Sequence, residues 1–261
     1  MSDRFVLETQ GLVKEFKGFV AVDDVNLKIQ QDHIHALIGP NGAGKTTVFN
    51  LLTKFLIPTG GKILFKGQDI TSMKSAAIAR KGVVRSFQIS AVFPHMTVLE
   101  NIRVALQSFA GTSFHFWKSG NSLNTLNERC MELLDQVGLA EFANTITVEL
   151  AYGRKRALEL ATTLAMEPDL LLLDEPTQGM GGEDVERVVE LVRKAAQGRT
   201  VLMVEHNLGV VSKLCDRITV LARGSVLAEG DYQQVSADPR VREVYMGSTS
   251  TSASATQEAT E

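Results

Sequence analysis

Short runs in which apolar and polar residues alternate fill the N-terminal part of the chain. The runs cover residues 5–10, 18–29 and 33–39. Alternation with a period of two is typical of strands that bury one face, and turn-forming residues separate the runs. The last residues of the third run are nearly all apolar. The pattern therefore predicts strands over this whole region.

A helical period replaces the alternation after the third run. Apolar residues recur at Val48, Leu51, Leu52 and Phe55. This spacing predicts a helix from Thr46 that ends before Pro58, because proline cannot continue a helix. The glycines at residues 60–61 turn the chain into a predicted strand pair over residues 62–70, and a short helix is expected over residues 75–82.

The pattern between residues 89 and 165 is mostly helical. Thr97 and Glu100 have the spacing of a capping box, in which each side chain bonds a free backbone amide at a helix start. A later apolar stripe predicts a helix that closes at Gly138. Between these two helices, residues 109–123 combine aromatic side chains with Gly, Ser and Asn, which favours an irregular loop.

A helix expected near Arg154 leads to Pro168, after which strands and helices alternate again. The expected strands cover residues 170–174, 200–206, 217–224 and 225–230, with a helix around residues 185–192. The tail has almost no apolar side chain to bury, so it is expected to be disordered. The pattern divides the chain into a mixed α/β part at residues 4–88 and 166–247, a helical part at residues 89–165, and a tail at residues 248–261.

Length and composition allow one large α/β domain or two smaller lobes, because 44% of the 261 residues are hydrophobic. The 27 basic and 30 acidic residues give a formal net charge of −3, so we expect no nucleic-acid partner. Cys130 and Cys215 stand far apart without metal-ligand spacing, which fits a reducing compartment. The first residues lack the pattern of a secretory signal, and no apolar run approaches the roughly 18 residues needed to span a bilayer.

The segment GPNGAGKT, residues 39–46, matches the phosphate-binding pattern G-x-x-x-x-G-K-[ST] between a predicted strand and a predicted helix. Glycines allow backbone amides to point at phosphate oxygens, and a helix N-terminus favours negative charge. In such a loop Lys45 reaches the β and γ phosphates, and the Thr46 hydroxyl coordinates Mg²⁺. A chance glycine-rich turn is the alternative, and the flanking strand and helix argue against it.

Four leucines followed by two acids and a proline occupy residues 170–176. A carboxylate at the end of a buried strand is costly unless a cation or a hydrogen-bond donor meets it. On a strand next to the phosphate loop, Asp174 can hold the Mg²⁺ shell through water, and Glu175 can orient or deprotonate an attacking water. By itself such a pair is more often a helix cap or a solvated turn, so the interpretation depends on the phosphate loop.

Three further segments follow in a characteristic order. Gln88 ends the apolar run VVRSFQ, the segment LAYGRKR covers residues 150–156, and His206 ends the run TVLMVEH. In this order and spacing, the chain resembles the ATP-binding subunits of ABC transporters over about residues 4–247. The resemblance implies an α/β P-loop NTPase with an ABC-type, RecA-like mixed-sheet core, an N-terminal antiparallel β region and an inserted α-helical subdomain.

The resemblance also implies roles for individual residues. Phe16 matches the aromatic residue that stacks on adenine, although a core strand residue is the alternative. Gln88 matches the glutamine that reaches toward Mg²⁺ and water, and His206 matches the histidine that contacts the γ phosphate. The implied nucleotide contacts are Phe16, Gly39, Pro40, Asn41, Gly42, Ala43, Gly44, Lys45, Thr46, Thr47, Tyr152 and Gly153. The implied metal ligands are Thr46, Gln88 and Asp174, and the implied catalytic residues are Glu175, His206 and Gln88. The other histidines, His33, His35, His95 and His115, show no ligand pattern.

Two positions depart from the family pattern. The family signature is typically L-S-G-G-Q, whose serine hydroxyl bonds the γ phosphate held by the opposing subunit, but this chain has Ala151 at that position. The amides of Tyr152 and Gly153 at a helix start can still face an anion. Gly181 stands where the family usually has an aspartate, so coupling across the subunit pair is in question. ATPase activity is still expected, because the phosphate, metal and water ligands all lie within the chain.

A narrower resemblance rests on the tyrosine in the signature, on the stretches RSFQ and FPHMTVLENI, and on the ending DPRVREVYMG. These features look like the ATPases of branched-chain amino-acid importers and of their urea and amide relatives. Lipopolysaccharide-export ATPases share some of them. The resemblance implies a peripheral protein at the cytoplasmic face of the cell membrane that binds ATP and Mg²⁺. It also implies a second ATP-binding subunit, either self or a paralogue, transmembrane permease subunits and, indirectly, a solute-binding protein.

Three other classes of protein share parts of this pattern. A DNA-repair ATPase needs a long coiled-coil insertion, but only about 60 residues without sustained heptads separate Gln88 from Leu150. A translation-type ATPase usually carries two cassettes, whereas this chain has one. A weakly active ATP-binding module stays open as an alternative, because Ala151 and Gly181 both lack the expected side chain.

Overall fold

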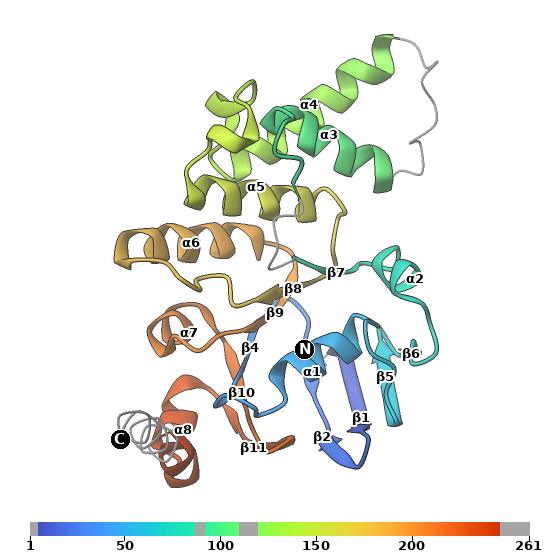
Figure 1. The fold of residues 1–261 in the computed structure, drawn as a ribbon, viewed down its shortest axis with the longest axis vertical. Helices are drawn as coiled ribbons and strands as arrows, with labels where there is room; N and C mark the ends of the chain where they lie inside the picture. The colour runs from blue at the N-terminus through green and yellow to red at the C-terminus, as the bar shows by residue number, and fades with distance from the viewer. Residues whose placement is uncertain (1–4, 87–91, 110–119, 246–261) are drawn as a thin grey trace, which may run out of the picture. The chain divides into compact units, whose positions relative to one another are not determined.

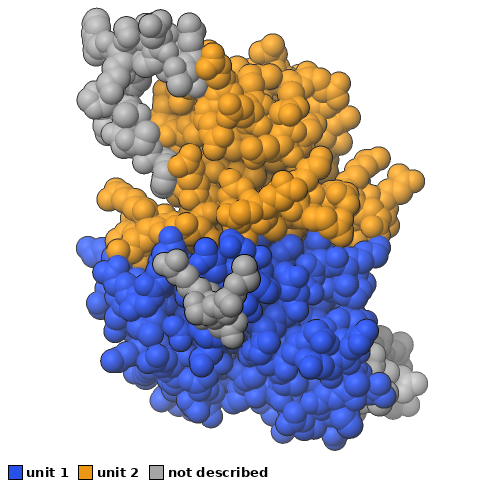
Figure 2. Space-filling model, turned by 180° about the vertical axis from the view of Figure 1, so that it is seen from behind, with its two compact units in different colours: residues 1–75, 200–261 blue, residues 76–199 orange. Residues whose placement is uncertain are grey.

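The computed structural model describes residues 5–86, 92–109 and 120–245 of the chain. The chain folds as two compact units, which Figure 2 distinguishes by colour. Unit 1 combines residues 1–75 with residues 200–261, and unit 2 consists of residues 76–199. Among the described residues, no helix has both the length and the apolar character needed to cross a bilayer.

The N-terminal part of unit 1 is an antiparallel sheet with the strand order β2-β1-β5-β6, and β3 pairs with β1 (Figure 1). Its strands are β1 (Phe5–Phe16), β2 (Phe19–Val25), β3 (Lys28–Gln30), β5 (Gly60–Phe65) and β6 (Gln68–Asp69). Alternation decides which side chains enter the core, since Leu7, Leu12 and Ile63 are fully buried while charged residues between them face outward. The alternating pattern thus correctly predicted strands in these segments, but not how the strands pair.

Unit 1 also contains a mostly parallel set of strands in the order β11-β10-β4-β9. These strands are β4 (Ile34–Ile38), β9 (Thr200–Val204), β10 (Arg217–Ala222) and β11 (Ser225–Gly230), of which β11 is antiparallel to β10. Every residue of β4 and β9 is buried, as expected for parallel strands that are covered on both faces. The helices of this unit are α1 (Lys45–Leu52), α7 (Leu208–Leu214) and α8 (Tyr232–Ala237), followed by a helical segment at residues 239–245.

Unit 2 is built from helices around a short parallel pair of strands, β7 (Val83–Arg85) and β8 (Leu170–Asp174). Its α-helices are α2 (Ser75–Ala79), which begins at the boundary, α3 (Val98–Phe109), α4 (Gly120–Gln136), α5 (Tyr152–Leu164) and α6 (Gly182–Ala195). Two short 3₁₀ turns, Ala140–Phe142 and Thr147–Glu149, connect α4 to α5. Helix α3 packs against α4 and α5, and α5 packs against α6.

The capping box at the start of α3 is confirmed by its hydrogen bonds. The backbone amide of Thr97 donates to Oε2 of Glu100 at 2.7 Å, and the amide of Glu100 donates to the Thr97 hydroxyl at 3.2 Å. The predicted close of the next helix is also confirmed, since α4 ends just before Gly138, whose φ is 70°. Residues 110–119 of the expected loop lie outside the described residues, as does the tail beyond Tyr245.

Two predicted elements end earlier than their apolar patterns indicated. The helix after the phosphate loop stops before Pro58 as expected, but it ends at Leu52 and does not reach Phe55, because Lys54 takes a left-handed backbone with φ 61°. Phe55 is consequently 56% exposed and is not part of a buried stripe. The strand expected to reach His206 ends at Val204. The sequence analysis bounds the helical part at residues 89–165, whereas unit 2 spans residues 76–199. The division of the chain at residues 89 and 165 stays a prediction.

Candidate functional site

The phosphate loop in unit 1 needs glycine at two positions for different reasons. Gly39 has φ 149°, and a Cβ placed there would lie 2.2 Å from the carbonyl oxygen of Leu221 in β10. Gly44 has φ 100°, and a Cβ there would lie 2.6 Å from the carbonyl oxygen of Ala21 in β2. The loop is therefore packed against backbone on two sides, which only glycine allows.

Lys45 folds back over the phosphate loop. Its side chain is buried, and Nζ donates to the carbonyl oxygens of Gly39 at 2.6 Å and Pro40 at 2.9 Å. Helix α1 starts at Lys45 without a side-chain cap and without an acid in its first turn. The amides at this helix start and the ammonium group together favour an anion, as the glycine pattern predicts. The side chain of Thr46 is exposed at the same helix start.

The C-terminal helical segment borders the phosphate loop, which the sequence reasoning missed. Glu243 and Val244 line a pocket of about 430 Å³ together with the loop residues 40–43 and Arg223. Tyr245 follows on the same segment, and its buried hydroxyl faces the backbone of Gly39. Burial raises the pKa of Tyr245 to about 12, and the nearby backbone of Gly39 only partly opposes this rise. The signal in the sequence was the helical spacing of Val241, Val244 and Tyr245 directly before the polar tail.

Phe16 lies at the end of β1, opposite Phe19 across the turn to β2. Its side chain is 40% exposed, so the alternative of a core strand residue is wrong. The ammonium group of Lys14 stands 5.0 Å from the centre of its ring. An exposed ring next to the strand that packs on Gly44 is free to meet a planar base by stacking.

His206 is held at the end of β9 by capping interactions on both sides. Glu205 is fully buried, and its Oε2 atom accepts the backbone amides of His206 at 2.9 Å and Asn207 at 3.1 Å. The Asn207 side chain caps α7 by accepting from the amides of Gly209 and Val210. The histidine side chain itself is exposed. The backbone at His206 is thereby fixed while its imidazole faces outward.

The acidic strand end in unit 2 places Asp174 and Glu175 in different environments. Asp174 is 7% exposed and forms an ion pair with Arg85, the last residue of the neighbouring strand β7. Glu175 is half-buried and has φ 47°, a left-handed conformation that is costly for a residue with a side chain. The sequence reasoning missed Arg85, whose signal was one charge at the end of the apolar run VVR.

The residues present fit a magnesium ion that is completed by phosphate. The described residues contain no cluster of three or more His, Cys, Asp or Glu side chains that could hold a metal without other ligands. Mg²⁺ usually takes one or two carboxylates together with phosphate oxygens and waters. Asp174 is a buried carboxylate, so one cation is favoured at its oxygens, and Arg85 holds that place in this structure. The remaining implied ligand, Gln88, lies outside the described residues.

The signature segment begins helix α5, with Ala151 as the residue before its first turn. Ala151 and Tyr152 are exposed, and no side chain caps this helix start. The segment lines a pocket of about 460 Å³ in unit 2, whose far wall includes Asp184 of α6. Gly181 directly precedes α6 and likewise gives no side-chain cap. At these two helix starts the chain therefore presents backbone amides without a capping hydroxyl or carboxylate.

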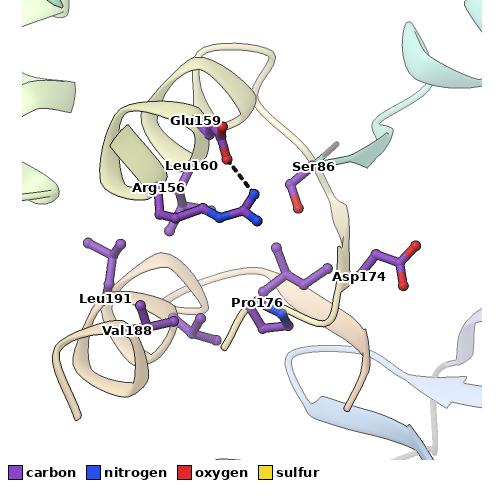
Figure 3. A pocket seen from close by; sticks show the side chains of 10 residues that line it. Ser86, Arg156, Glu159, Leu160, Asp174, Pro176, Val188 and Leu191 are labelled. Carbon is purple, nitrogen blue, oxygen red and sulfur yellow. Dashed lines mark hydrogen bonds and ion pairs between the residues drawn. The ribbon is translucent and has the colours of Figure 1, made fainter. Parts of the chain in front are cut away.

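A smaller cavity of about 40 Å³ lies behind the signature helix and is lined by Arg156, Glu159, Ser86 and Asp174 among others. Arg156 donates to Glu159 at 2.8 Å and to the Tyr152 hydroxyl at 3.0 Å. Burial lowers the pKa of Arg156, but the bonds to Glu159 and Tyr152 outweigh this and raise it overall. Figure 3 shows the Arg156 guanidinium turned toward Glu159 and the Asp174 carboxylate pointing away from Arg156.

Each unit brings together a part of the expected site. Unit 1 carries the phosphate loop, Phe16 and His206, and unit 2 carries Asp174, Glu175 and the signature segment. Within unit 1, β2 and β10 both pack on the phosphate loop. That all of these residues meet around one triphosphate stays a prediction.

Comparison with known proteins gives the same family as the motifs. The family model described as "ABC transporter" matches residues 22–178, and one described as "Branched-chain amino acid ATP-binding cassette transporter" matches residues 225–250. The second match covers the C-terminal segment that borders the phosphate loop.

Similar proteins cover nearly the whole chain. BraF of Pseudomonas aeruginosa, a high-affinity branched-chain amino acid transport ATP-binding protein, is 40% identical over 94% of this chain and 98% of its own length. LivG of Escherichia coli K12, which has the same description, is 39% identical over 93% of this chain and 98% of its own. Among solved structures, the ADP conformation of MJ1267, an ATP-binding cassette of an ABC transporter, has a TM-score of 0.81 and 28% identity over 93% of this chain and 99% of that one. The chain therefore belongs to the ABC transporter family and is one of its nucleotide-binding ATPase cassettes.

Proposed function

We propose that this chain hydrolyses magnesium-bound ATP to drive the import of branched-chain amino acids or of related small polar solutes such as urea and amides. The observation that carries the proposal is the phosphate loop, which packs against the backbone of β2 and β10. The loop presents the uncapped amides at the start of α1 and the side chain of Lys45, which folds back over the loop. The substrate class rests on the names of the two similar proteins and on the match of the C-terminal segment. The membrane and solute-binding subunits would choose among these solutes, since they contact the solute.

The residues of this chain divide the reaction between them. Lys45 leaves the carbonyls of Gly39 and Pro40 to neutralise the β and γ phosphates. Glu175 accepts a proton from the attacking water as the water oxygen bonds the γ phosphorus and the bond to the β-phosphate oxygen breaks, which releases ADP and phosphate. His206 and Gln88 contact the γ phosphate and the water. When bound, Mg²⁺ supplies positive charge at the phosphate oxygens, with Thr46, Asp174 and Gln88 as its protein partners.

Two nucleotide-binding subunits, either two copies of this chain or this chain and a paralogue, close around two ATP molecules. The amides of Tyr152 and Gly153 at the uncapped start of α5 face the γ phosphate held by the partner, where Ala151 provides no hydroxyl. ATP can drive closure because it contacts the closed pair from both sides and the open pair from one. Hydrolysis removes the contact and reopens the pair.

The chain acts at the cytoplasmic face of the membrane through permease subunits. Phe93 is 52% exposed in the segment that leads to α3, so core packing does not explain it. Met96 on the same stretch is half-buried. Phe93 is the residue of this stretch with apolar surface to offer a cytoplasmic segment of the permease.

The nucleotide assignment is tested by replacing Lys45. We expect Lys45→Ala to abolish tight ATP binding, a loss of more than about 2 kcal/mol, because a buried charged partner is removed. The matched control is Lys62→Ala, which removes an exposed lysine of β5. Fluorescence titration with a labelled ATP analogue measures both. Titration curves that coincide for Lys45→Ala and the unchanged chain contradict the phosphate-loop assignment.

The transport assignment is tested with the native membrane complex purified through a tag on this chain and placed in vesicles. ATP-dependent uptake of labelled leucine, abolished by Lys45→Ala, is the expected result. Uptake of urea or amides alone narrows the substrate class within the proposal. Copurification of lipopolysaccharide-export subunits would replace the import proposal by lipopolysaccharide export. An ATPase rate that stays near zero with the membrane partners present would replace it by the weakly active ATP-binding module.

A further inference from the structure

Arg85 and Asp174 end two adjacent parallel strands of unit 2. Residue Arg85 pairs in register with Leu172, and the amide of Ser86 donates to the Leu172 carbonyl at 2.9 Å. The carboxyl ends of parallel strands meet at one edge of a sheet. The backbone therefore fixes the base of the Arg85 side chain beside the end of β8.

The guanidinium of Arg85 forms an ion pair with Oδ2 of Asp174. Both side chains are nearly removed from water, with 11% and 2% of their surfaces exposed. A carboxylate buried to this extent is strongly destabilising without a cationic partner, and removal of one partner of such a pair leaves a charge uncompensated. Arg85 thus provides the positive charge that makes a buried Asp174 tolerable.

The second arginine near this carboxylate is already engaged. Arg156 lines the small cavity together with Asp174, but its guanidinium bonds Glu159 and the Tyr152 hydroxyl. Figure 3 shows the Arg156 guanidinium bonded to Glu159 and the Asp174 carboxylate pointing away from Arg156. Among the ion pairs of the described residues, Asp174 takes part in the one with Arg85.

Under the proposed function, the Asp174 carboxylate has to face Mg²⁺ and its waters during ATP binding. A guanidinium in direct contact with the same carboxylate and a divalent cation repel each other, and both compete for its lone pairs. The two cations therefore exclude each other at this carboxylate.

We propose that Arg85 is a built-in counter-ion of Asp174 that competes with magnesium for this carboxylate and must be displaced from it when magnesium nucleotide binds. The exchange makes the apparent magnesium affinity depend on how often the pair is open. If the pair is closed about nine-tenths of the time, the magnesium midpoint lies about tenfold above its intrinsic value. Arg85 is then a positioning residue that sets the magnesium threshold for nucleotide binding and compensates the buried Asp174 charge when no magnesium ion does so.

The test is a magnesium titration of nucleotide binding in the full chain carrying Arg85→Met. Affinity for a fluorescent, non-hydrolysable ATP analogue is measured over a range of Mg²⁺ concentrations. We expect the magnesium midpoint to fall about tenfold, because Asp174 no longer has a competing cation. The thermal midpoint of the nucleotide-free chain should fall, while the gain in thermal midpoint on adding magnesium nucleotide should grow.

Three variants make the result decisive. Arg129→Met removes a half-buried arginine of α4 that pairs with Glu132 and Glu167, and it should leave the magnesium midpoint unchanged. Asp174→Asn added to Arg85→Met should restore part of the stability of the nucleotide-free chain, because no charge is then left unpaired. Arg85→Lys keeps the charge with a looser fit, folds if Arg85→Met does not, and should lower the midpoint by a smaller factor.

A packing role alone predicts a different pattern. The stability lost in Arg85→Met would then be equal with and without magnesium nucleotide, and the magnesium midpoint would not move in either Arg85 variant, which overturns the proposal. This outcome can be distinguished from failure of the proposed function. If the proposed function is wrong, Lys45→Ala binds nucleotide like the unchanged chain.

Discussion

His35 lies in β4 with its Nε2 atom 2.8 Å from the Thr219 hydroxyl and 1% of its surface exposed. Burial lowers its pKa from 6.5 to about 3, and the charges of Arg217 and His33 lower it further. The folded chain therefore holds this imidazole neutral at pH values where the unfolded chain takes up a proton. Above pH 6.5 His35 is neutral in both the folded and the unfolded chain. As the pH falls from 6.5 toward 3, only the unfolded chain takes up the proton, so the free energy of unfolding decreases.

We expect His35→Leu to flatten the acid limb of the stability curve. At about 1.36 kcal/mol per pKa unit, His35 accounts for a decrease of up to roughly 4 to 5 kcal/mol in the free energy of unfolding between pH 6.5 and 3. Thr219 retains Glu229 as a second neighbour at 3.3 Å in this variant. Urea unfolding at several pH values measures the effect, and His95→Gln, which changes an exposed histidine, is the matched control. An acid limb of unchanged steepness in His35→Leu contradicts the assignment.

Burial also decides the reactivity of the two cysteines. It raises the pKa of Cys215 to about 12, with the charges of Asp216 and Glu205 adding to the rise, and it raises the pKa of the fully buried Cys130. The thiolate is the reactive form, so both residues should resist thiol reagents at pH 8 in the folded chain. A thiol reagent whose reaction is followed by absorbance should detect no fast-reacting cysteine in the folded chain and two in the chain unfolded by guanidinium. A fast-reacting thiol in the folded chain would show that its sulfur is reached by solvent.

Helix ends hold functional side chains at the scale of the element. Asn207 caps α7 directly after His206, and Glu205 caps the same turn from the other side. The histidine was recognised from its place after an apolar run, but the capping pair that fixes it became visible only when β9 was seen to end at Val204. A hydrogen bond across a turn depends on backbone angles, which an apolar pattern does not encode.

We expect Asn207→Ala to lower the free energy of unfolding by about 1 kcal/mol, because two amides of α7 lose their acceptor. Turnover should fall more than ATP affinity, since His206 is attached to the frayed turn. Asn207→Ser retains a capping oxygen and should preserve both quantities. Urea unfolding and steady-state ATPase rates measure these quantities. Equal free energies of unfolding and equal turnover in the alanine and serine variants would show that the Asn207 cap does not position His206.

At the scale of the whole molecule, the proposed motor requires two subunits and both units of each chain. Glu175→Gln keeps the shape of the proposed base but cannot accept the proton, so ATP binding should persist while turnover falls by on the order of 10² to 10⁴. Closed dimers should then accumulate with ATP and Mg²⁺, as sedimentation or size-exclusion chromatography can measure. Lys45→Ala is the matched variant that should stay monomeric. Turnover of Glu175→Gln at the level of the unchanged chain removes Glu175 from its role.

The sequence by itself determined the family, the strand and helix order, and the motifs at residues 39–46 and 170–175, because periodicity and short motifs are local properties of the chain. Tertiary structure alone decided which charges meet: Arg85 on Asp174, Lys45 on the carbonyls of its own loop, and the C-terminal segment beside the phosphate loop. These contacts join residues far apart in the chain or depend on backbone angles. The energy of a buried charge is set by the partner that packing brings to it, and the order of residues does not state that partner.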